Sequence, residues 1–370
     1  MVGFRTDFVL TYPFNPLPKS ADSSPNIAKT VRSKDKQMTI GIGILGCGRI
    51  SRHHFSAAQA LAPRAKVVAA CDVDARLLNE RCDQFDVARR VSAVEELARC
   101  AEVDVVVVVT PPHVRLAVAQ PLLEAGKHLL VEKPFTESMA EAHAIVDLAA
   151  RLGRQVAVNQ NYRWYDAIIH TRGLIQSGRI GAPTYAVIHD CVWRDEVSGW
   201  RRETTRLALA VMGIHWLDRL RWLLMDEPVA VSSLTGMRPT LASQGENETT
   251  TIVEFRNGAL ATLTHSWSSQ TRGRANFQQF DGPQGSLVLS EDAEVTLYSG
   301  EEEQRWSFAR DFTASFGASL RLLLDAVESG QEAPHSARDN LMTMALLEAC
   351  YLSAAERRRV EIAPVEGQVW

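Results

Sequence analysis

The sequence predicts two parts of different fold class, a doubly wound α/β part followed by an α+β part. Uninterrupted runs of Val, Ile and Leu, as at Val103–Val109, alternate with helical patterns as far as Gln160. Such runs are typical of parallel strands that are buried on both faces. Beyond Gln160, extended segments follow one another with turn residues between them, which is the pattern of an antiparallel sheet.

In the first part we expect strands and helices in strict alternation, because parallel strands need crossover connections. The expected strands are Ile40–Leu45, Val67–Cys71, Val103–Val109, His128–Val131 and Val156–Val158. The expected helices are Ile50–Leu61, Arg76–Gln84, Val94–Arg99, Val114–Glu124 and Glu137–Leu152.

In the second part we expect mostly strands, framed by amphipathic helices. The expected helices are Ala167–Ser177, Leu207–Leu224, Phe316–Ser329 and Asn340–Glu356. The expected strands are Thr184–Ile188, Val229–Thr235, Thr250–Phe255, Ala259–Ser266, Gly285–Leu289 and Glu294–Tyr298. Asn257 and Gly258 predict a hairpin with a type I′ turn, which needs positive φ at both positions.

The chain of 370 residues is long enough for two domains, and we place them at residues 38–160 and 161–370. Residues 1–37 are rich in Pro and Ser without helical or strand periodicity, and we expect a disordered leader there.

The composition excludes several partners. A net charge of −4 gives no general attraction to nucleic acid or to an anionic membrane. No apolar run is long enough to cross a bilayer. The six cysteines are scattered without a C-x-x-C pair, which favours reduced thiols and a cytoplasmic protein.

A glycine turn joins the first strand to the first helix. Gly46 permits the tight turn, Gly48 lets a diphosphate approach the backbone, and the helix that begins near Arg49 and Ile50 supplies N–H donors. Ser51 stands where the motif has a third Gly or an Ala, so the fingerprint is imperfect. The strand–turn–helix context predicts dinucleotide binding.

Two further strand ends face the same edge of the predicted sheet. Asp72 follows the second strand, where a carboxylate binds the ribose hydroxyls and repels a 2′-phosphate, so NAD is favoured over NADP. A solvated strand-end aspartate is the alternative. Thr110 and Pro111 end the third strand in a turn that we expect either to contact the cofactor or simply to close the strand.

Glu132 and Lys133 end the next parallel strand, just before Pro134. A lysine at this edge lies beside the ligand, where its ammonium can polarise a substrate oxygen or its lowered pKa can allow proton transfer. A surface lysine before a turn is the alternative.

The segment Gly126–Pro134, together with the glycine turn, Thr110–Pro112 and Asn161–Trp164, resembles the Gfo/Idh/MocA oxidoreductases, such as glucose–fructose oxidoreductase and inositol dehydrogenase. The resemblance covers residues 39–362. It implies an N-terminal Rossmann domain that binds NAD(P) and a C-terminal α+β domain with a large, mostly antiparallel open sheet. It also implies reversible hydride transfer at a sugar or cyclitol hydroxyl, and homodimers or homotetramers packed through that sheet.

The resemblance also assigns roles to residues. Lys133 becomes catalytic or substrate-orienting, and Glu132 lies on the nicotinamide side. His215 matches the family's second-domain histidine. The residues expected near the substrate are Asn161, Tyr162 and Arg163.

The chain departs from the family pattern before His215. The pattern has an aspartate four residues earlier, on the same helical face, and this chain has Val211 there. Either His215 works without that aspartate and Lys133 supplies the electrostatics, or His215 is a core residue that Asp218 and Arg219 satisfy within its helix. Arg115 likewise stands where the family commonly has a histidine.

Trp200 and Arg201 lie in a segment rich in Arg and Trp. Guanidinium groups bind carboxylate or phosphate, and tryptophans stack on sugar faces, which would suit an acidic or phosphorylated sugar. Because Asp195, Glu196 and Glu203 are interleaved, a solvated loop that pairs with itself is an equal alternative.

We therefore predict an NAD-dependent enzyme that transfers hydride between the nicotinamide and a hydroxyl or carbonyl group of a sugar, cyclitol or polyol. Lys133 polarises the oxygen and His215 exchanges the proton. Two alternatives remain: a cofactor-binding sensor without catalysis, and an enzyme that modifies glycosides by oxidation, elimination and reduction with bound NAD. We expect no metal site, because His53–His54 and His189–Asp190 are neighbours in sequence that do not converge on one ion.

Overall fold

The computed structural model describes residues 39–365. The leader predicted at residues 1–37 lies outside them. Across residues 39–365, no helix has both the length and the apolar character needed to cross a bilayer.

The first sheet has six parallel strands in the order β3-β2-β1-β4-β5-β6, which confirms the doubly wound class. The strands are β1 (Ile40–Leu45), β2 (Ala65–Cys71), β3 (Arg89–Val91), β4 (Val105–Val108), β5 (His128–Val131) and β6 (Val156–Val158). The sequence pattern does not predict β3. It is a three-residue edge strand whose two arginines are exposed, so it carries no apolar run.

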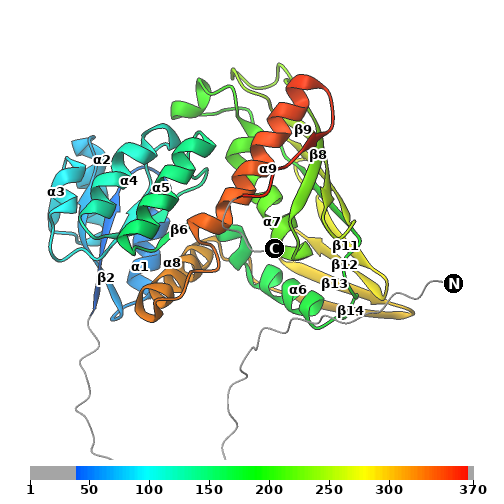
Figure 1. Cartoon of the computed structure of the whole chain (residues 1–370), viewed down its shortest axis with the longest axis horizontal. Helices are drawn as coiled ribbons and strands as arrows, with labels where there is room; N and C mark the ends of the chain where they lie inside the picture. The colour runs from blue at the N-terminus through cyan, green and yellow to red at the C-terminus, as the bar shows by residue number, and fades with distance from the viewer. Residues whose placement is uncertain (1–38, 366–370) are drawn as a thin grey trace, which may run out of the picture. The chain divides into compact units, whose positions relative to one another are not determined.

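Helices cover both faces of this sheet, because alternate strand residues point to opposite sides. Val105 and Val107 of β4 belong to a core with α1 (Ser51–Ala60), α2 (Ala75–Phe85) and α8 (Phe312–Ser329). Val106 and Val108 belong to a core with α3 (Val94–Ala98), α4 (Arg115–Glu124) and α5 (Met139–Leu152). The chain thus returns through α8 to the first sheet, where α8 packs against α1 (Figure 1).

The second sheet has nine strands in the order β14-β13-β12-β11-β7-β10-β9-β8-β15, and only the β7–β10 pair is parallel. The strands are β7 (Tyr185–Cys191), β8 (Pro228–Gly236), β9 (Glu248–Phe255), β10 (Leu260–Ser266), β11 (Phe277–Gly282), β12 (Gly285–Ser290), β13 (Glu294–Ser299), β14 (Glu302–Ser307) and β15 (Val360–Glu361). The predicted open, mostly antiparallel sheet is confirmed. The pattern does not predict β11, β14 and β15, which are polar or very short.

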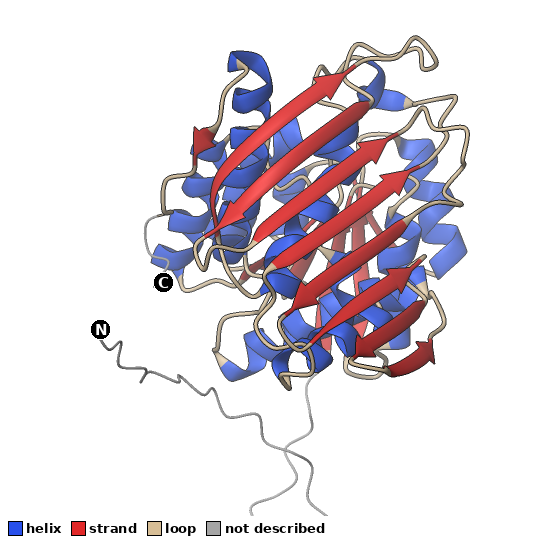
Figure 2. Ribbon diagram, turned by 90° about the vertical axis from the view of Figure 1, so that its right-hand side faces the viewer, coloured by secondary structure: helices blue, strands red, loops and turns tan. Residues whose placement is uncertain are grey.

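One face of the second sheet packs on helices, and the other is open (Figure 2). The covering helices are α6 (Asp166–Gln176), α7 (Ile214–Leu224) and α9 (Ala337–Glu356). The short helical turns are η1 (Pro112–Val114), η2 (Asn161–Trp164), η3 (Gly199–Arg202) and the π-helical turn η4 (Leu209–Gly213). Exposed apolar side chains on the strands include Tyr185, Ile252, Leu260, Phe277 and Tyr298.

The β9–β10 hairpin forms as predicted, but its turn type is not I′. Among the described residues, Gly258 has positive φ (87°) and Asn257 does not. The Gly258 N–H donates to the Phe255 carbonyl at 3.0 Å, and the Asn257 side-chain oxygen accepts from the Ala259 N–H at 2.8 Å. A type I turn followed by a left-handed glycine explains this geometry.

Candidate active site

A cavity of about 1050 Å³ lies at the carboxyl ends of β1, β2, β4 and β5 and is closed by segments of the second half of the chain. All but one of the predicted site residues line it. The predicted residues that do so are Gly46, Gly48, Arg49, Ile50, Asp72, Thr110, Pro111, Glu132, Lys133, Asn161, Tyr162, Trp200, Arg201 and His215.

The glycine turn leaves room for a ligand. Gly46 has φ of +100°, and a Cβ there would meet the backbone of Val109 at 3.0 Å. Gly48 lines the cavity, and a Cβ there would meet no protein atom within 4 Å. The Ser51 hydroxyl donates to the Gly48 carbonyl at 2.6 Å, so this departure from the motif ties the turn to α1.

The Asp72 carboxylate is held at the cavity wall by backbone donors. One oxygen accepts from the Cys47 N–H at 2.6 Å, and the other from the Asp74 N–H at 2.8 Å. The first turn of α1 contains no acidic residue. An open turn, a helix N-terminus free of acidic residues and a fixed carboxylate together fit the diphosphate and ribose of a dinucleotide.

Arg115 joins the loop after β4 to the loop after β5. Its buried guanidinium donates to the Thr110 carbonyl at 2.6 and 2.8 Å, to Pro134 at 3.1 Å and to Phe135 at 3.3 Å, and also to the Glu132 carbonyl. Burial lowers its pKa to about 10, and the charge of Glu132 acts in the opposite direction. The arginine therefore fixes the turn after β4 to the segment after β5.

Glu132 is buried and fully engaged. One carboxylate oxygen lies 2.8 Å from His54 Nε2 and 2.7 Å from Asn159 Nδ2. Burial alone would raise the pKa of Glu132, but the hydrogen bond and charge of His54, with smaller contributions from Lys133 and Asn159, hold it below its usual value. No sequence pattern indicates His54 or Asn159 in this role, because both lie far from Glu132 along the chain.

Lys133 crosses the cavity to the second half of the chain. Its Nζ donates to the carbonyl of Val211 at 2.6 Å. Burial lowers the pKa of Lys133 to about 8; Glu132 opposes this shift, whereas the charges of Arg201, Arg194 and Arg115 reinforce it. A surface lysine before a turn is thus not what the structure shows.

His215 lies one helical turn after Val211 and lines the same cavity. Its Nδ1 is 3.0 Å from Gln160 Oε1, and its ring stacks on Tyr162 with centroids 4.0 Å apart. With the Gln160 amide in this orientation the proton is on Nδ1, which leaves Nε2 as an acceptor. Burial and then the charges of Lys133 and Arg219 hold the pKa of His215 well below its usual value.

The alternative in which residues of its own helix satisfy His215 is wrong. Asp218 binds Arg163 and Thr343, and Arg219 binds Asp292 and Gln278.

Glu246 and Tyr351 hold the π-helical turn η4, which contains Val211, and the residues just before it. The Glu246 carboxylate accepts from the N–H groups of Leu207 and Leu209 at 2.8 and 2.9 Å. The Tyr351 hydroxyl donates to Glu246 at 2.8 Å and accepts from the Ala210 N–H at 3.2 Å. No local pattern could have predicted these two residues, since the fold brings them to the turn from the segment before β9 and from α9.

Arg163, which we expected near the substrate, does not line the cavity. Its guanidinium binds Asp218 at 2.5 and 2.6 Å and Asp339 at 2.7 Å, and it is 2 % exposed. Burial of a guanidinium requires such carboxylate partners. The residue therefore ties η2 to α7 and α9. Its neighbour Asn161 does reach the cavity and donates to the Ser315 hydroxyl at 2.8 Å.

In the segment around Trp200 and Arg201, some charged side chains pair with each other and others do not. Arg202 donates to Glu196 at 3.0 Å and to the Val197 carbonyl at 2.8 Å. Arg201 instead lies 5.1 Å from the Trp200 ring centroid and faces the cavity.

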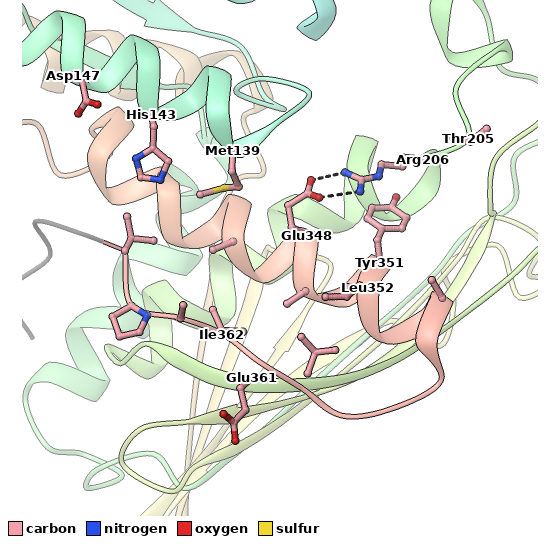
Figure 3. A pocket seen from close by; sticks show the side chains of 17 residues that line it. Met139, His143, Asp147, Thr205, Arg206, Glu348, Tyr351, Leu352, Glu361 and Ile362 are labelled. Carbon is pink, nitrogen blue, oxygen red and sulfur yellow. Dashed lines mark hydrogen bonds and ion pairs between the residues drawn. The ribbon is translucent and has the colours of Figure 1, made fainter.

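A second cavity, of about 1020 Å³, lies among α5, α9 and β15 (Figure 3). It contains no predicted site residue. Its most buried charges, Arg206 and Glu348, neutralise each other through two hydrogen bonds (Figure 3). The two cavities are similar in volume, but the glycine turn and the predicted site residues line the first. Within residues 39–365, no group of His, Cys, Asp and Glu could hold a metal ion.

A doubly wound sheet whose strand ends face an open-sheet domain is the architecture of a two-domain nicotinamide-dependent dehydrogenase. Two family descriptions match this chain: an oxidoreductase family with an NAD-binding Rossmann fold at residues 40–160, and the C-terminal alpha/beta domain of that family at residues 172–362. The chain belongs to the Gfo/Idh/MocA oxidoreductases, and it is an NAD(P)-dependent oxidoreductase that acts on CH–OH groups.

Its relatives include a D-apiose dehydrogenase of Paraburkholderia graminis, 28% identical over 88% of this chain and 90% of the relative. An inositol 2-dehydrogenase of Saccharopolyspora erythraea is 30% identical over 88% of this chain and 97% of the relative. A solved oxidoreductase of Agrobacterium radiobacter, in complex with NAD⁺, L-tartaric acid and magnesium, has a TM-score of 0.82 and 26% identity over 88% of this chain and 99% of its own. The names of these proteins support neither of the two alternative functions, a cofactor-binding sensor or a glycoside-modifying enzyme.

Replacement of Arg163 tests its structural role. We expect Arg163→Met to lower the free energy of unfolding by about 3–5 kcal/mol, because Asp218 would remain buried without its partner. The double variant Arg163→Met/Asp218→Asn should recover part of this loss. Chemical denaturation measures both effects. Calorimetric NAD affinity of the folded fraction should stay within about twofold of the parent, and a large loss of NAD affinity would contradict the assignment.

Proposed function

We propose that this oxidoreductase transfers hydride between NAD and a hydroxyl or carbonyl carbon of a sugar, cyclitol or related polyol. Lys133 orients and polarises the substrate oxygen, and His215 exchanges its proton. The observation that carries this proposal is that the Lys133 amine and the His215 imidazole reach one cavity, with Val211 between them. The names of the D-apiose and inositol dehydrogenases support the substrate class.

The chemistry divides between cofactor and chain. When bound, the nicotinamide supplies the hydride acceptor or donor. Lys133 uses one N–H for the Val211 carbonyl, and its other two donors remain for a substrate oxygen. His215, neutral at physiological pH, accepts the hydroxyl proton during oxidation at Nε2, while Gln160 fixes the ring. Tyr162 and Trp200 supply aromatic walls for the carbons of the substrate.

The pH dependence of kcat/KM distinguishes two roles for Lys133. A charged ammonium would polarise the substrate oxygen, whereas a neutral amine would act as the base. We expect kcat/KM for alcohol oxidation to fall above about pH 8, because the raised pH removes the ammonium that polarises the oxygen. Lys133→Met should lower kcat by about 10²-fold or more. Lys133→Arg should be slower than the parent but keep its activity to higher pH, since a guanidinium stays charged. Steady-state rates measured by NADH absorbance decide this, and a rise in kcat/KM through pH 8 would assign Lys133 as the base.

We also propose that Asp72 makes NAD the preferred cofactor, because its fixed carboxylate would repel a 2′-phosphate. In Asp72→Asn the shape is retained and the charge is lost. The ratio of NADP to NAD affinity should then rise about tenfold, which corresponds to about 1.4 kcal/mol. Calorimetric titration of both cofactors measures this ratio; an unchanged ratio would show that the aspartate does not discriminate.

We further propose a cytoplasmic homodimer or homotetramer packed through the open face of the second sheet. The six free, buried cysteines agree with a reducing compartment. Ile252 and Leu260 are 46% and 45% exposed on neighbouring strands of that sheet.

A charge on the open sheet face tests the assembly. Ile252→Glu should yield monomers in light scattering, because a buried, unpaired carboxylate opposes association. The matched change Leu352→Glu, at a 43% exposed position on α9, should leave the oligomer intact. Monomers in the parent protein would refute the proposal.

A further inference from the structure

The active-site cavity is positively charged although the chain as a whole carries a net charge of −4. Six cationic side chains line it against three carboxylates. The cationic ones are Arg49, Arg52, Arg115, Lys133, Arg194 and Arg201. A cavity lined by one sign of charge concentrates ligands of the opposite sign.

The three carboxylates do not neutralise the arginines of the second half of the chain. Asp72 accepts from two backbone N–H groups, and Glu132 is engaged by His54 and Asn159. Glu196 pairs with Arg202, which does not line the cavity.

Arg194 and Arg201 are left with aromatic partners alone. The Arg194 guanidinium lies 4.7 Å from the Trp267 ring centroid, its backbone N–H donates to the Trp267 carbonyl at 2.8 Å, and its Nε is buried without a partner. Arg201 lies over Trp200. Within residues 39–365, neither side chain has an ion pair with a carboxylate within 4.0 Å, so two half-buried guanidinium groups face the cavity with donors to spare.

Arg194 and Arg201 come from a different part of the chain than the cofactor diphosphate site, although the charge of Arg49 at the glycine turn lowers the pKa of both. The diphosphate site, at Gly48 and the start of α1, belongs to the first half of the chain. Arg194 and Arg201 come from the loop after β7 and from η3, and their charges act on Lys133, the residue at the reacting oxygen. Burial lowers the pKa of Arg201, and the charges of Arg49 and Arg194 lower it further. An anion bound between them would relieve this repulsion.

We propose that the preferred substrate is a sugar or polyol bearing an anionic group, a carboxylate or a phosphate, which Arg194 and Arg201 bind beside the reacting hydroxyl. This inference rests on the proposed dehydrogenase function. Guanidinium groups stacked on tryptophan rings are preorganised for bidentate binding of such anions. The Trp200 ring, which lines the cavity, would pack against the carbons of the same ligand.

The test compares acids and phosphates with their neutral parents on the NAD-loaded protein. Turnover is followed by NADH absorbance with D-glucose, D-glucuronate, D-gluconate and D-glucose 6-phosphate, with the galactose series, and with myo-inositol and its 1-phosphate. Calorimetry measures binding of the same compounds to the NADH-saturated protein. We expect an anionic compound to exceed its neutral parent in kcat/KM by about tenfold or more, the effect of one charged hydrogen bond. The carboxylate and phosphate arms identify which anion is preferred.

Variants then locate the anion. Arg194→Gln and Arg201→Gln should raise KM for the anionic substrate about tenfold and leave NAD affinity unchanged. Arg305→Gln, a matched change at an exposed residue of β14 outside the cavity, should alter neither. Added salt should weaken binding of the anion more than binding of its neutral parent.

The outcomes separate this inference from the proposed function. Turnover of neutral sugars without preference for an anion would overturn the inference and leave the dehydrogenase assignment intact. Weakened NAD binding in Arg194→Gln and Arg201→Gln, with substrate KM unchanged, would place both arginines on the cofactor and also overturn it. NAD binding with neither turnover nor binding of any compound would refute both.

Discussion

The hydrogen bond from Lys133 to the carbonyl of Val211 is the contact on which the active site depends. Lys133 follows β5 of the parallel sheet, and Val211 lies in the π-helical turn before α7 of the second half. The bond therefore joins the two halves at the cavity in which we propose that cofactor and substrate meet. Because His215 lies one turn further along the same helical segment, this contact links the position of the lysine to that of the histidine.

Two groups of buried residues keep that contact in place without taking part in it. From the first half, Arg115 gathers the carbonyls of the loops after β4 and β5, and His54 with Asn159 holds Glu132. From the second half, Glu246 caps the backbone that leads into the π-helical turn. These charged side chains are satisfied by backbone groups or by each other, so they position the loops, and Lys133 and His215 line the cavity.

Features that depend on residues close together in the sequence could be predicted. Contacts between residues far apart in the sequence could not. Valine runs and a glycine turn located the parallel sheet and the cofactor side of the cavity, since both depend on residues close in the chain. Strands such as β3 escaped prediction because their residues are polar and are held by neighbours rather than by burial. Arg163 was misplaced for a related reason: a motif puts an arginine beside the site, but the carboxylates of Asp218 and Asp339 turn its side chain into the core.

Val211 gives the electrostatics of the cavity a consistent explanation. Its position is that of an aspartate in the family pattern, so this chain lacks a carboxylate one helical turn before His215. The Lys133 ammonium donates to the backbone carbonyl of Val211, and this carbonyl carries no formal negative charge. The positive charge of Lys133 is thus not cancelled from the second half, and Arg194 and Arg201 add to it from the same side. An enzyme for neutral polyols gains nothing from that excess, because the repulsion among the three cations only lowers the pKa of the lysine it needs. A substrate that brings its own anion would supply the missing charge, restore a high pKa to Lys133 when it binds, and so couple recognition of the anion to polarisation of the reacting oxygen.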